Sequence, residues 1–262
     1  MDISNLDVDA DLFKGKKVGE ILILSFREKP LLHVMDLSIK KALFDYLDLV
    51  ACCDEIKVLL IKETSTKMSR SEYIAFYKNM IRPGFDQMPL ERMYNAINQF
   101  ILKLRDLNKM IIHADSGRVI LLFLNISLAC DYRIVADNTI YQNPNIELGV
   151  VPKGGSVFFL SKILGSVTAS KLLLSREDVT AVNAHQLGIV DKVVPLKDLD
   201  RMALETARSY ARLPSNYFIG IKKLLNFNFK ELWSYFEFEN ALLRRQVRSC
   251  KLHDFGRLDE KL

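Results

Sequence analysis

The stretch from Lys109 to Gly165 decides the fold, and it reads KMIIHADSGRVILLFLNISLACDYRIVADNTIYQNPNIELGVVPKGGSVFFLSKILG. It opens with the apolar run of residues 110–114, whose composition is typical of a buried strand. Strand-like and helix-like spacings then alternate. This alternation predicts an α/β protein in which helices pack against sheets.

The same alternation precedes this stretch. Residues 18–26 and 56–61 are apolar runs that predict strands. Residues 36–50 have apolar positions at helical spacing behind a possible cap at Asp36. Residues 69–104 are helical in pattern, and Arg82-Pro83-Gly84 interrupts them, because proline ends a helix and glycine permits a turn.

Strand patterns stop at residue 195. Amphipathic helical segments are predicted at residues 196–213, 216–226 and 230–249, and one side of the last segment carries Leu232, Phe236, Glu239, Leu243 and Val247. We therefore expect a core domain over residues 1–195 and a C-terminal helical region over residues 196–262. The apolar surface of these helices needs a partner, which is either another subunit or the core itself.

Composition sets outer limits on the function. The chain has 262 residues, of which 49% are hydrophobic and 26% charged, as in ordinary globular proteins. The longest near-apolar stretch, residues 119–130, is short of the roughly 20 residues that span a bilayer, and no secretory signal is visible. These features predict a cytoplasmic protein without a membrane partner.

The charge and cysteine patterns point to no nucleic acid and no metal. The formal charge of +5 is spread along the chain, without a basic block interleaved with aromatic residues. The four cysteines, two of them adjacent, show no metal-ligand spacing and fit a reducing compartment. An anionic small molecule, such as a phosphate-bearing cofactor, remains compatible with the charge.

The stretch 109–165 resembles the crotonase superfamily, also called the enoyl-CoA hydratase/isomerase family. The matching features are the strand, Ser116-Gly117, the segment ending Leu128-Ala129-Cys130-Asp131, the segment Pro144 to Gly149, and Gly154-Gly155. The resemblance covers roughly residues 15 to 250. It implies a crotonase (ClpP-like) spiral fold of repeated ββα units with a C-terminal helical region that mediates oligomerisation, as a homotrimer or hexamer.

Members of this family stabilise an oxyanion with two backbone N–H groups. One donor starts the helix that follows a glycine triplet, where this chain has Leu121-Leu122-Phe123; by position the donor is Leu122. A helix N-terminus offers unpaired N–H groups whatever its side chains, although these bulky residues should narrow the acyl pocket. The second donor maps to Glu72, where an ordinary helix cap at Ser69 or Ser71 is the alternative.

The two glutamates that usually transfer protons in the family are replaced by Asn125 and Asn145. Carboxamides do not exchange protons near neutral pH, so ordinary hydration is disfavoured. Both residues can still orient a water or a carbonyl group, and a purely structural role is the alternative. Lys153 stands where some branches have a working aspartate; it either engages a substrate carboxylate or extends to solvent.

The resemblance also implies a ligand. Family members bind acyl-CoA thioesters, so coenzyme A would enter as part of the substrate, with no permanent cofactor and no metal. The loop that wraps the CoA in relatives corresponds to residues 29–35, with His33, Val34 and Met35 in the contacting positions.

Three functional hypotheses follow. The first is a lyase or isomerase of the crotonase type that uses the oxyanion hole on an acyl-CoA or acyl-carrier thioester, with Lys153 assisting a decarboxylation. The second is a catalytically silent thioester binder or partner subunit. The third is an unusual hydratase or hydrolase that recruits Glu72, Glu147 or Tyr141.

Overall fold

The computed structural model describes residues 6–33, 36–62, 67–81, 86 and 88–249, and within them seven strands form a main sheet in the order β1-β2-β3-β4-β5-β7-β10. The first three strands pair antiparallel, and the strands from β3 onward pair in parallel. Their bounds are β1 Val8–Asp9, β2 Phe13–Val18, β3 Ile21–Phe26, β4 Val58–Lys62, β5 Met110–Asp115, β7 Tyr132–Ala136 and β10 Lys192–Val194.

A smaller sheet of three strands lies in the same described part of the chain, in the order β6-β8-β9, with bounds β6 Arg118–Ile120, β8 Ile140–Gln142 and β9 Val179–Thr180. Strand β5 of the main sheet is followed by β6 and helix α5, and strand β7 is followed by β8 and helix α6. The strand, strand, helix repeat that the resemblance implies is therefore present.

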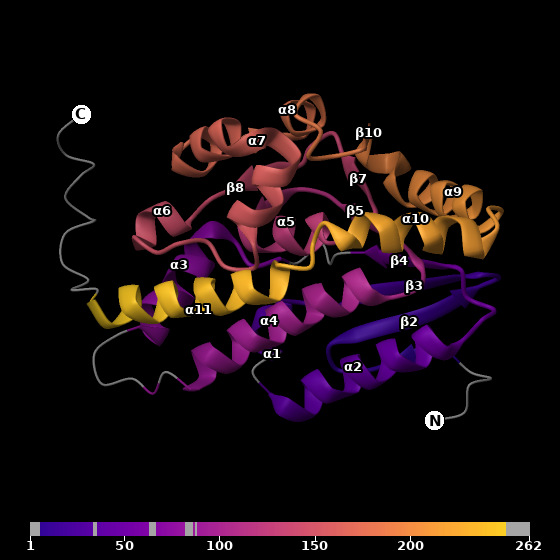
Figure 1. Cartoon of the computed structure of the whole chain (residues 1–262), viewed down its shortest axis with the longest axis horizontal. Coiled ribbons are helices and arrows are strands. Elements are labelled where there is room, and N and C mark those ends of the chain that lie inside the picture. The colour runs from indigo at the N-terminus through magenta and orange to yellow at the C-terminus, as the bar shows by residue number, and fades with distance from the viewer. Residues whose placement is uncertain (1–5, 34–35, 63–66, 82–85, 87, 250–262) are drawn as a thin grey trace.

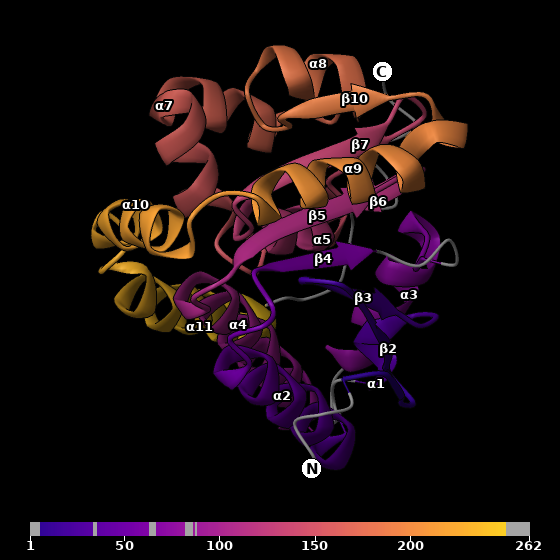
Figure 2. The same ribbon diagram turned by 90° about the vertical axis from the view of Figure 1, so that its right-hand side faces the viewer.

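Helices flank both sheets (Figure 1). Their bounds are α1 Pro30–His33, α2 Leu37–Cys52, α3 Arg70–Met80, α4 Met88–Asp106, α5 Leu121–Leu128, α6 Asn145–Leu148, α7 Ser156–Leu174, α8 Ala181–Gln186, α9 Leu199–Ala211, α10 Ser215–Phe227 and α11 Leu232–Ser249, with a 3-10 turn at Leu196–Asp198. Helix α11 runs beside α4 in both Figure 1 and Figure 2, although the two are far apart in the sequence.

Helices cover both faces of the parallel strands, which explains why these strands read as continuous apolar runs. On one face, Val58 and Leu60 of β4 pack with α9, which presents small residues four positions apart: Ala203, Ala207 and Ala211. Figure 2 shows α9 lying along the sheet. Leu59 and Ile61 of β4 join the larger core on the other face, with residues of α2, α4 and α5.

Most of the predicted elements are confirmed. Helix α2 begins after Asp36, whose carboxylate accepts hydrogen bonds from the backbone N–H groups of Ser38 and Ile39. The helical pattern at 69–104 is divided into α3 and α4, and the Arg82-Pro83-Gly84 interruption lies outside the described residues. The strand predicted at 18–26 is confirmed as β3, but it begins at Ile21, because Val18 ends β2 and Gly19 adopts a positive φ of 61° in the turn between the two strands.

Helix α7 is the one helix of the described residues with the length and apolar composition of a membrane span. It is longer than residues 119–130, the near-apolar stretch that was compared with a membrane span from the sequence. Its helical geometry breaks at Gly165, where φ is 74° and ψ is 157°, so the segment is divided into two shorter helical pieces. Length and composition alone are weak evidence for a membrane span.

Candidate functional site

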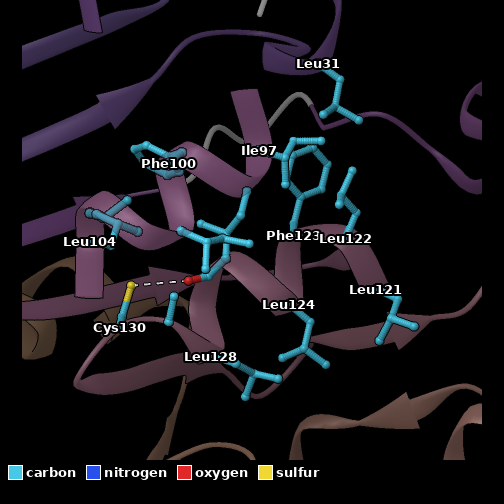
Figure 3. Packing of buried hydrophobic residues seen from close by; sticks show 14 of the residues in the cluster. Leu31, Ile97, Phe100, Leu104, Leu121, Leu122, Phe123, Leu124, Leu128 and Cys130 are labelled. Carbon is cyan, nitrogen blue, oxygen red and sulfur yellow. Dashed lines mark hydrogen bonds between the residues drawn. The ribbon is translucent and has the colours of Figure 1, made fainter. Parts of the chain in front are cut away.

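Helix α5 presents three different rows of side chains, because residues three apart lie on the same side of an α-helix. All eight of its residues are buried. Leu122 and Asn125 face the turn before α7, and Phe123 and Ile126 face an apolar pocket. A third row, Leu121 and Leu124, faces Tyr141 across another pocket. Figure 3 shows Phe123 beside Ile97, with Leu121 and Leu124 directed away from it.

The N-terminus of α5 keeps its backbone donors free of a side-chain cap. Ile120 is the N-cap residue and makes no side-chain hydrogen bond to the first turn. Leu122 is the second helical residue, so its N–H points out of the helix end rather than to a carbonyl of the preceding turn. This is the backbone group that the sequence predicts as an oxyanion donor.

The side chain of Leu122 fills space beside this donor. Its Cδ1 atom would lie 3.3 Å from a Cβ atom placed on Gly154, and the Cδ1 atom of Ile101 would lie 3.4 Å from it. Gly154 has a positive φ of 88°, which leaves it in a conformation that side chains disfavour. Leucine in place of the family's glycine therefore closes the gap between α5 and the turn that precedes α7.

Asn125 is completely buried and tied to the protein. Its amide Nδ2 donates to the carbonyl oxygen of Lys153 at 2.7 Å and to the Ser156 hydroxyl. Its Oδ1 atom is buried without a hydrogen-bond partner among the described residues. The side chain thus joins α5 to the start of α7.

Asn145 is also buried, at the first position of α6. Its Nδ2 donates to Asn143 Oδ1 at 3.1 Å, and its Oδ1 accepts from the Tyr73 hydroxyl at 3.3 Å. Burial raises the pKa of Tyr73, so this phenol stays protonated and acts as a hydrogen-bond donor near neutral pH.

Lys153 does not reach solvent, because only 1% of its side chain is exposed. Its ammonium donates to Glu239 Oε2 at 2.6 Å and to the Asn98 Oδ1 atom. The rings of Tyr94 and Phe236 have their centroids 5.6 and 5.2 Å from the same nitrogen. Burial lowers the pKa of Lys153, and the neighbouring Glu239 carboxylate offsets part of this shift.

Glu239 holds the turn as well as the lysine. Its two carboxylate oxygens accept from the backbone N–H groups of Gly154 and Gly155, at 3.0 and 2.9 Å. Helix α11 therefore contributes a buried counter-ion to the middle of the candidate site. The sequence does carry a signal for this residue. Glu239 is the acid among the apolar residues on one side of α11.

Three buried tyrosines pack together in the same region, and this cluster was not predicted from the sequence. Tyr73 and Tyr77 of α3 have ring centroids 4.6 Å apart, and Tyr77 and Tyr94 have centroids 6.5 Å apart. All three rings are at most 4% exposed. They occupy the interior between Asn145 at one end and Lys153 at the other.

The other predicted residues lie nearer the surface. The Glu72 N–H donates to Ser69 Oγ at 3.3 Å in a capping box, and the Glu72 carboxylate binds Lys29. Its role as second oxyanion donor stays a prediction. His33 ends α1 and is half-buried, and Val34 and Met35 lie outside the described residues.

Of the other residues considered for an unusual hydratase, Glu147 is paired with an arginine and Tyr141 is buried. Glu147 accepts from Arg70 Nε at 2.6 Å, and Tyr141 is buried with a raised pKa. Among the described residues, no group of three histidine, cysteine, aspartate or glutamate side chains is placed to hold a metal ion.

The strand, strand, helix repeat and the uncapped start of α5 at Leu121 define an α/β protein of the crotonase type. The family model described as enoyl-CoA hydratase/isomerase matches residues 83–253, and the chain belongs to this family. The resemblance read from the sequence is thereby confirmed.

Relatives in the family differ in activity. The chain is 24% identical over 209 residues to the trans-2-decenoyl-[acyl-carrier-protein] isomerase of Streptococcus mutans, covering 80% of this chain and 78% of that protein. It is 33% identical over 114 residues to the 2,3-dehydroadipyl-CoA hydratase of Escherichia coli, covering 44% of this chain and 45% of that protein. The chain thus spans less than half of the length of that hydratase.

Solved structures confirm the fold. An enoyl-CoA hydratase from Bacillus halodurans superposes with a TM-score of 0.77 at 16% identity, covering 91% of this chain and 96% of that one. The structure of DspI from Pseudomonas aeruginosa gives a TM-score of 0.72 at 23% identity, covering 89% of this chain and 95% of that one. At these identities the likeness concerns the fold alone.

Proposed function

We propose that this protein binds an acyl thioester, of CoA or of an acyl carrier, without catalysing hydration or a double-bond shift. The observation that carries the proposal is that the amides of Asn125 and Asn145, in the two glutamate positions, are bonded within the protein. The buried pairing of Lys153 with Glu239 at 2.6 Å adds that the lysine is engaged as well. A lysine held in this way is neutralised by its partner and is not available to a substrate carboxylate. Removing it from the pair would leave a buried carboxylate without a counter-ion, which is strongly unfavourable.

Among the described residues, the two positions that correspond to the family's glutamates carry no side chain that exchanges a proton near neutral pH. The two asparagines in the glutamate positions use their amides for hydrogen bonds within the protein, Asn125 to Lys153 and Ser156, and Asn145 to Asn143. General acid or base catalysis requires a side chain that exchanges a proton in reach of the substrate. This supports a binding function over the reactions that relatives such as the hydratase of E. coli are named for.

Thioester binding rests on features that do not need those side chains. The family to which the chain belongs is described by its enoyl-CoA chemistry, and one relative is named for an acyl-carrier substrate. The first turn of α5 offers backbone donors without a side-chain cap, and a helix N-terminus favours a partly negative oxygen. Coenzyme A would be part of the ligand rather than a permanent cofactor.

The experiment follows the absorbance of crotonyl-CoA with and without the protein, beside a competent hydratase of the family as positive control. We expect the absorbance to stay constant with this protein while it falls with the control. Calorimetric titration with the same thioester tests binding separately. Sustained turnover would contradict the silent assignment, and the lack of any binding at millimolar ligand would contradict thioester recognition.

A second candidate is decarboxylation of a malonyl-type thioester, in which loss of CO₂ forms an enolate without a base. The uncapped first turn of α5 favours it, because that turn could stabilise the enolate oxygen. It requires Lys153 to leave Glu239. Release of CO₂ from methylmalonyl-CoA, abolished in a Lys153→Met/Glu239→Gln variant that still folds, would favour this candidate over the silent one.

Assembly as a homotrimer or hexamer is part of the same proposal. Large apolar side chains are exposed on the last helices, including Tyr217, Leu224 and Phe227 of α10 and Trp233 and Phe238 of α11. Such surface favours association with another copy. Sedimentation velocity tests it, and a monomer at all concentrations would contradict it. The cytoplasmic location and the division at residue 195 stay predictions.

A further inference from the structure

The carboxylate of Glu239 is held in the way that proteins hold the carboxylate of a bound organic acid. Its Oε2 atom accepts from the ammonium of Lys153 at 2.6 Å and from the backbone N–H of Gly154 at 3.0 Å. Its Oε1 atom accepts from the backbone N–H of Gly155 at 2.9 Å. Each oxygen therefore has a donor, and the donors belong to three successive residues. We refer to these three residues as the 153–155 turn.

The backbone of the 153–155 turn is shaped to receive an anion. Gly154 and Gly155 have positive φ values of 88° and 80°, and their N–H groups point to the same carboxylate. Successive N–H groups arranged in this way form a concave anion site. Gly155 is also the N-cap of α7 and has no side chain to cap it, so Glu239 supplies the missing acceptor from α11. The helix end adds partial positive charge to that of Lys153.

Helix α11 covers the turn with more than Glu239. Gln246 lies seven residues further along, on the same side of the helix, and its Oε1 atom accepts from the backbone N–H of Val151 at 2.9 Å. Phe236, one helical turn before Glu239, is buried and lies so close that a Cβ atom placed on Gly155 would be 3.2 Å from its ring. Helix α11 is thus a strap over the turn that carries its own acid.

The charges at this place balance only while Glu239 is present. Lys153 is 1% exposed, and its hydrogen bond to Asn98 Oδ1 brings no negative charge. Without the carboxylate, a buried ammonium would lack its counter-ion. Glu239→Ala removes one carboxylate group and one methylene group, which together have the four heavy atoms of acetate. Free acetate therefore matches the emptied space in size, charge and hydrogen-bonding capacity.

We propose that Lys153, Gly154 and Gly155 form a carboxylate-binding site, and that α11 blocks this site in cis with its own Glu239. The ligand class is a small monocarboxylate, which reaches the site where Glu239 is absent or displaced. The proposal goes beyond thioester binding and does not depend on it. While Glu239 is in place, the chain's own acid keeps a substrate carboxylate away from Lys153.

The test is the rescue of Glu239→Ala by acetate, measured by thermal unfolding at neutral pH. We expect saturating sodium acetate to raise the unfolding temperature of this variant by about 5 °C beyond the effect of sodium chloride at equal ionic strength, because a ligand that binds only the folded state stabilises it. Acetamide, which has the shape of acetate without its charge, should have no such effect. The unaltered protein should respond to acetate as it does to chloride, since Glu239 fills its site.

Three variants serve as controls. Glu239→Gln keeps the volume of the side chain and should show no rescue by acetate. Leu243→Ala truncates a buried residue one turn further along the same side of α11, and it should show none because it leaves Glu239 in place. Lys153→Met/Glu239→Ala keeps the two glycine N–H groups but lacks the ammonium, and its apparent affinity for acetate should fall at least about tenfold.

The test remains decisive if the variant does not fold by itself. If Glu239→Ala is unfolded without acetate, far-UV circular dichroism should show that helix content returns with acetate and not with chloride. An effect of acetate on Glu239→Ala no greater than that of chloride, by either measurement, would overturn the proposal. Equal rescue of Leu243→Ala, or undiminished affinity in Lys153→Met/Glu239→Ala, would overturn it too. No thioester enters these measurements, so their failure would leave the proposed function standing.

Discussion

The ammonium of Lys153 lies 2.6 Å from the carboxylate of Glu239, and the two side chains are 1% and 3% exposed. The pair joins the turn before α7 to the C-terminal helix α11 through the middle of the candidate site. A lysine that the sequence suggests for a substrate carboxylate thus already has a carboxylate partner within the chain.

Removing Glu239 should therefore destabilise the fold strongly. We expect Glu239→Ala to lower the free energy of unfolding by about 3–5 kcal/mol, because it leaves the buried ammonium of Lys153 without its counter-ion and two glycine N–H groups without their acceptor. The loss is measured by urea unfolding at neutral pH.

The double variant Lys153→Met/Glu239→Gln provides the matched control. It should lose less than the sum of Lys153→Met and Glu239→Gln, because neither charge is then left alone. Strict additivity of the two single losses would show that the residues do not interact.

Restoring the family's carboxylates should not restore the family's reaction. We expect Asn125→Glu/Asn145→Glu to hydrate crotonyl-CoA no faster than the unaltered protein, because Leu122 still closes the space beside Gly154. The variant should also be less stable, since buried carboxylates without partners are costly. The absorbance assay and a thermal melt check both points. Substantial turnover would show that the absence of the two carboxylates alone accounts for the lack of hydration.

The Glu72 carboxylate should contribute to stability except in acid. Hydrogen bonds from Lys29 and Ser69 lower its pKa from 4.5 to about 2. A carboxylate whose pKa is lower in the folded state stabilises the fold above its unfolded pKa, and this contribution disappears as the pH falls from about 4.5 to 2.

We therefore expect Glu72→Gln to lose less stability than the unaltered protein when the pH is lowered from 5 to 2.5. Urea unfolding across this range measures the difference. Lys29→Met removes the largest contributor to the shift and should move the loss to higher pH. Identical acid dependence in all three proteins would rule out a lowered pKa at Glu72.

The fold was open to prediction from the sequence because its signals are local. The apolar runs that became β4 and β5, the Asp36 cap and the alternation around α5 each depend on neighbours within a few residues. The hairpin between β2 and β3 was missed because Val18 and Ile21 are both apolar. A single glycine at position 19 carries the turn.

The candidate site could be predicted only in part. Positions 125, 145 and 153 are singled out by the resemblance to the family's motifs, and all three are buried. Their partners come from distant segments: Asn98 is 55 residues before Lys153, and Glu239 is 86 residues after it. No local pattern links residues so far apart, so the engagement of Lys153 could be seen only in three dimensions.

Calorimetric titration of the protein with crotonyl-CoA tests most directly whether it binds a thioester without turning it over. We expect saturable heat of binding, after which the heat flow returns to the baseline following every injection. A lasting heat flow that scales with protein concentration would reveal turnover and contradict the account, and so would the absence of any binding heat at millimolar ligand.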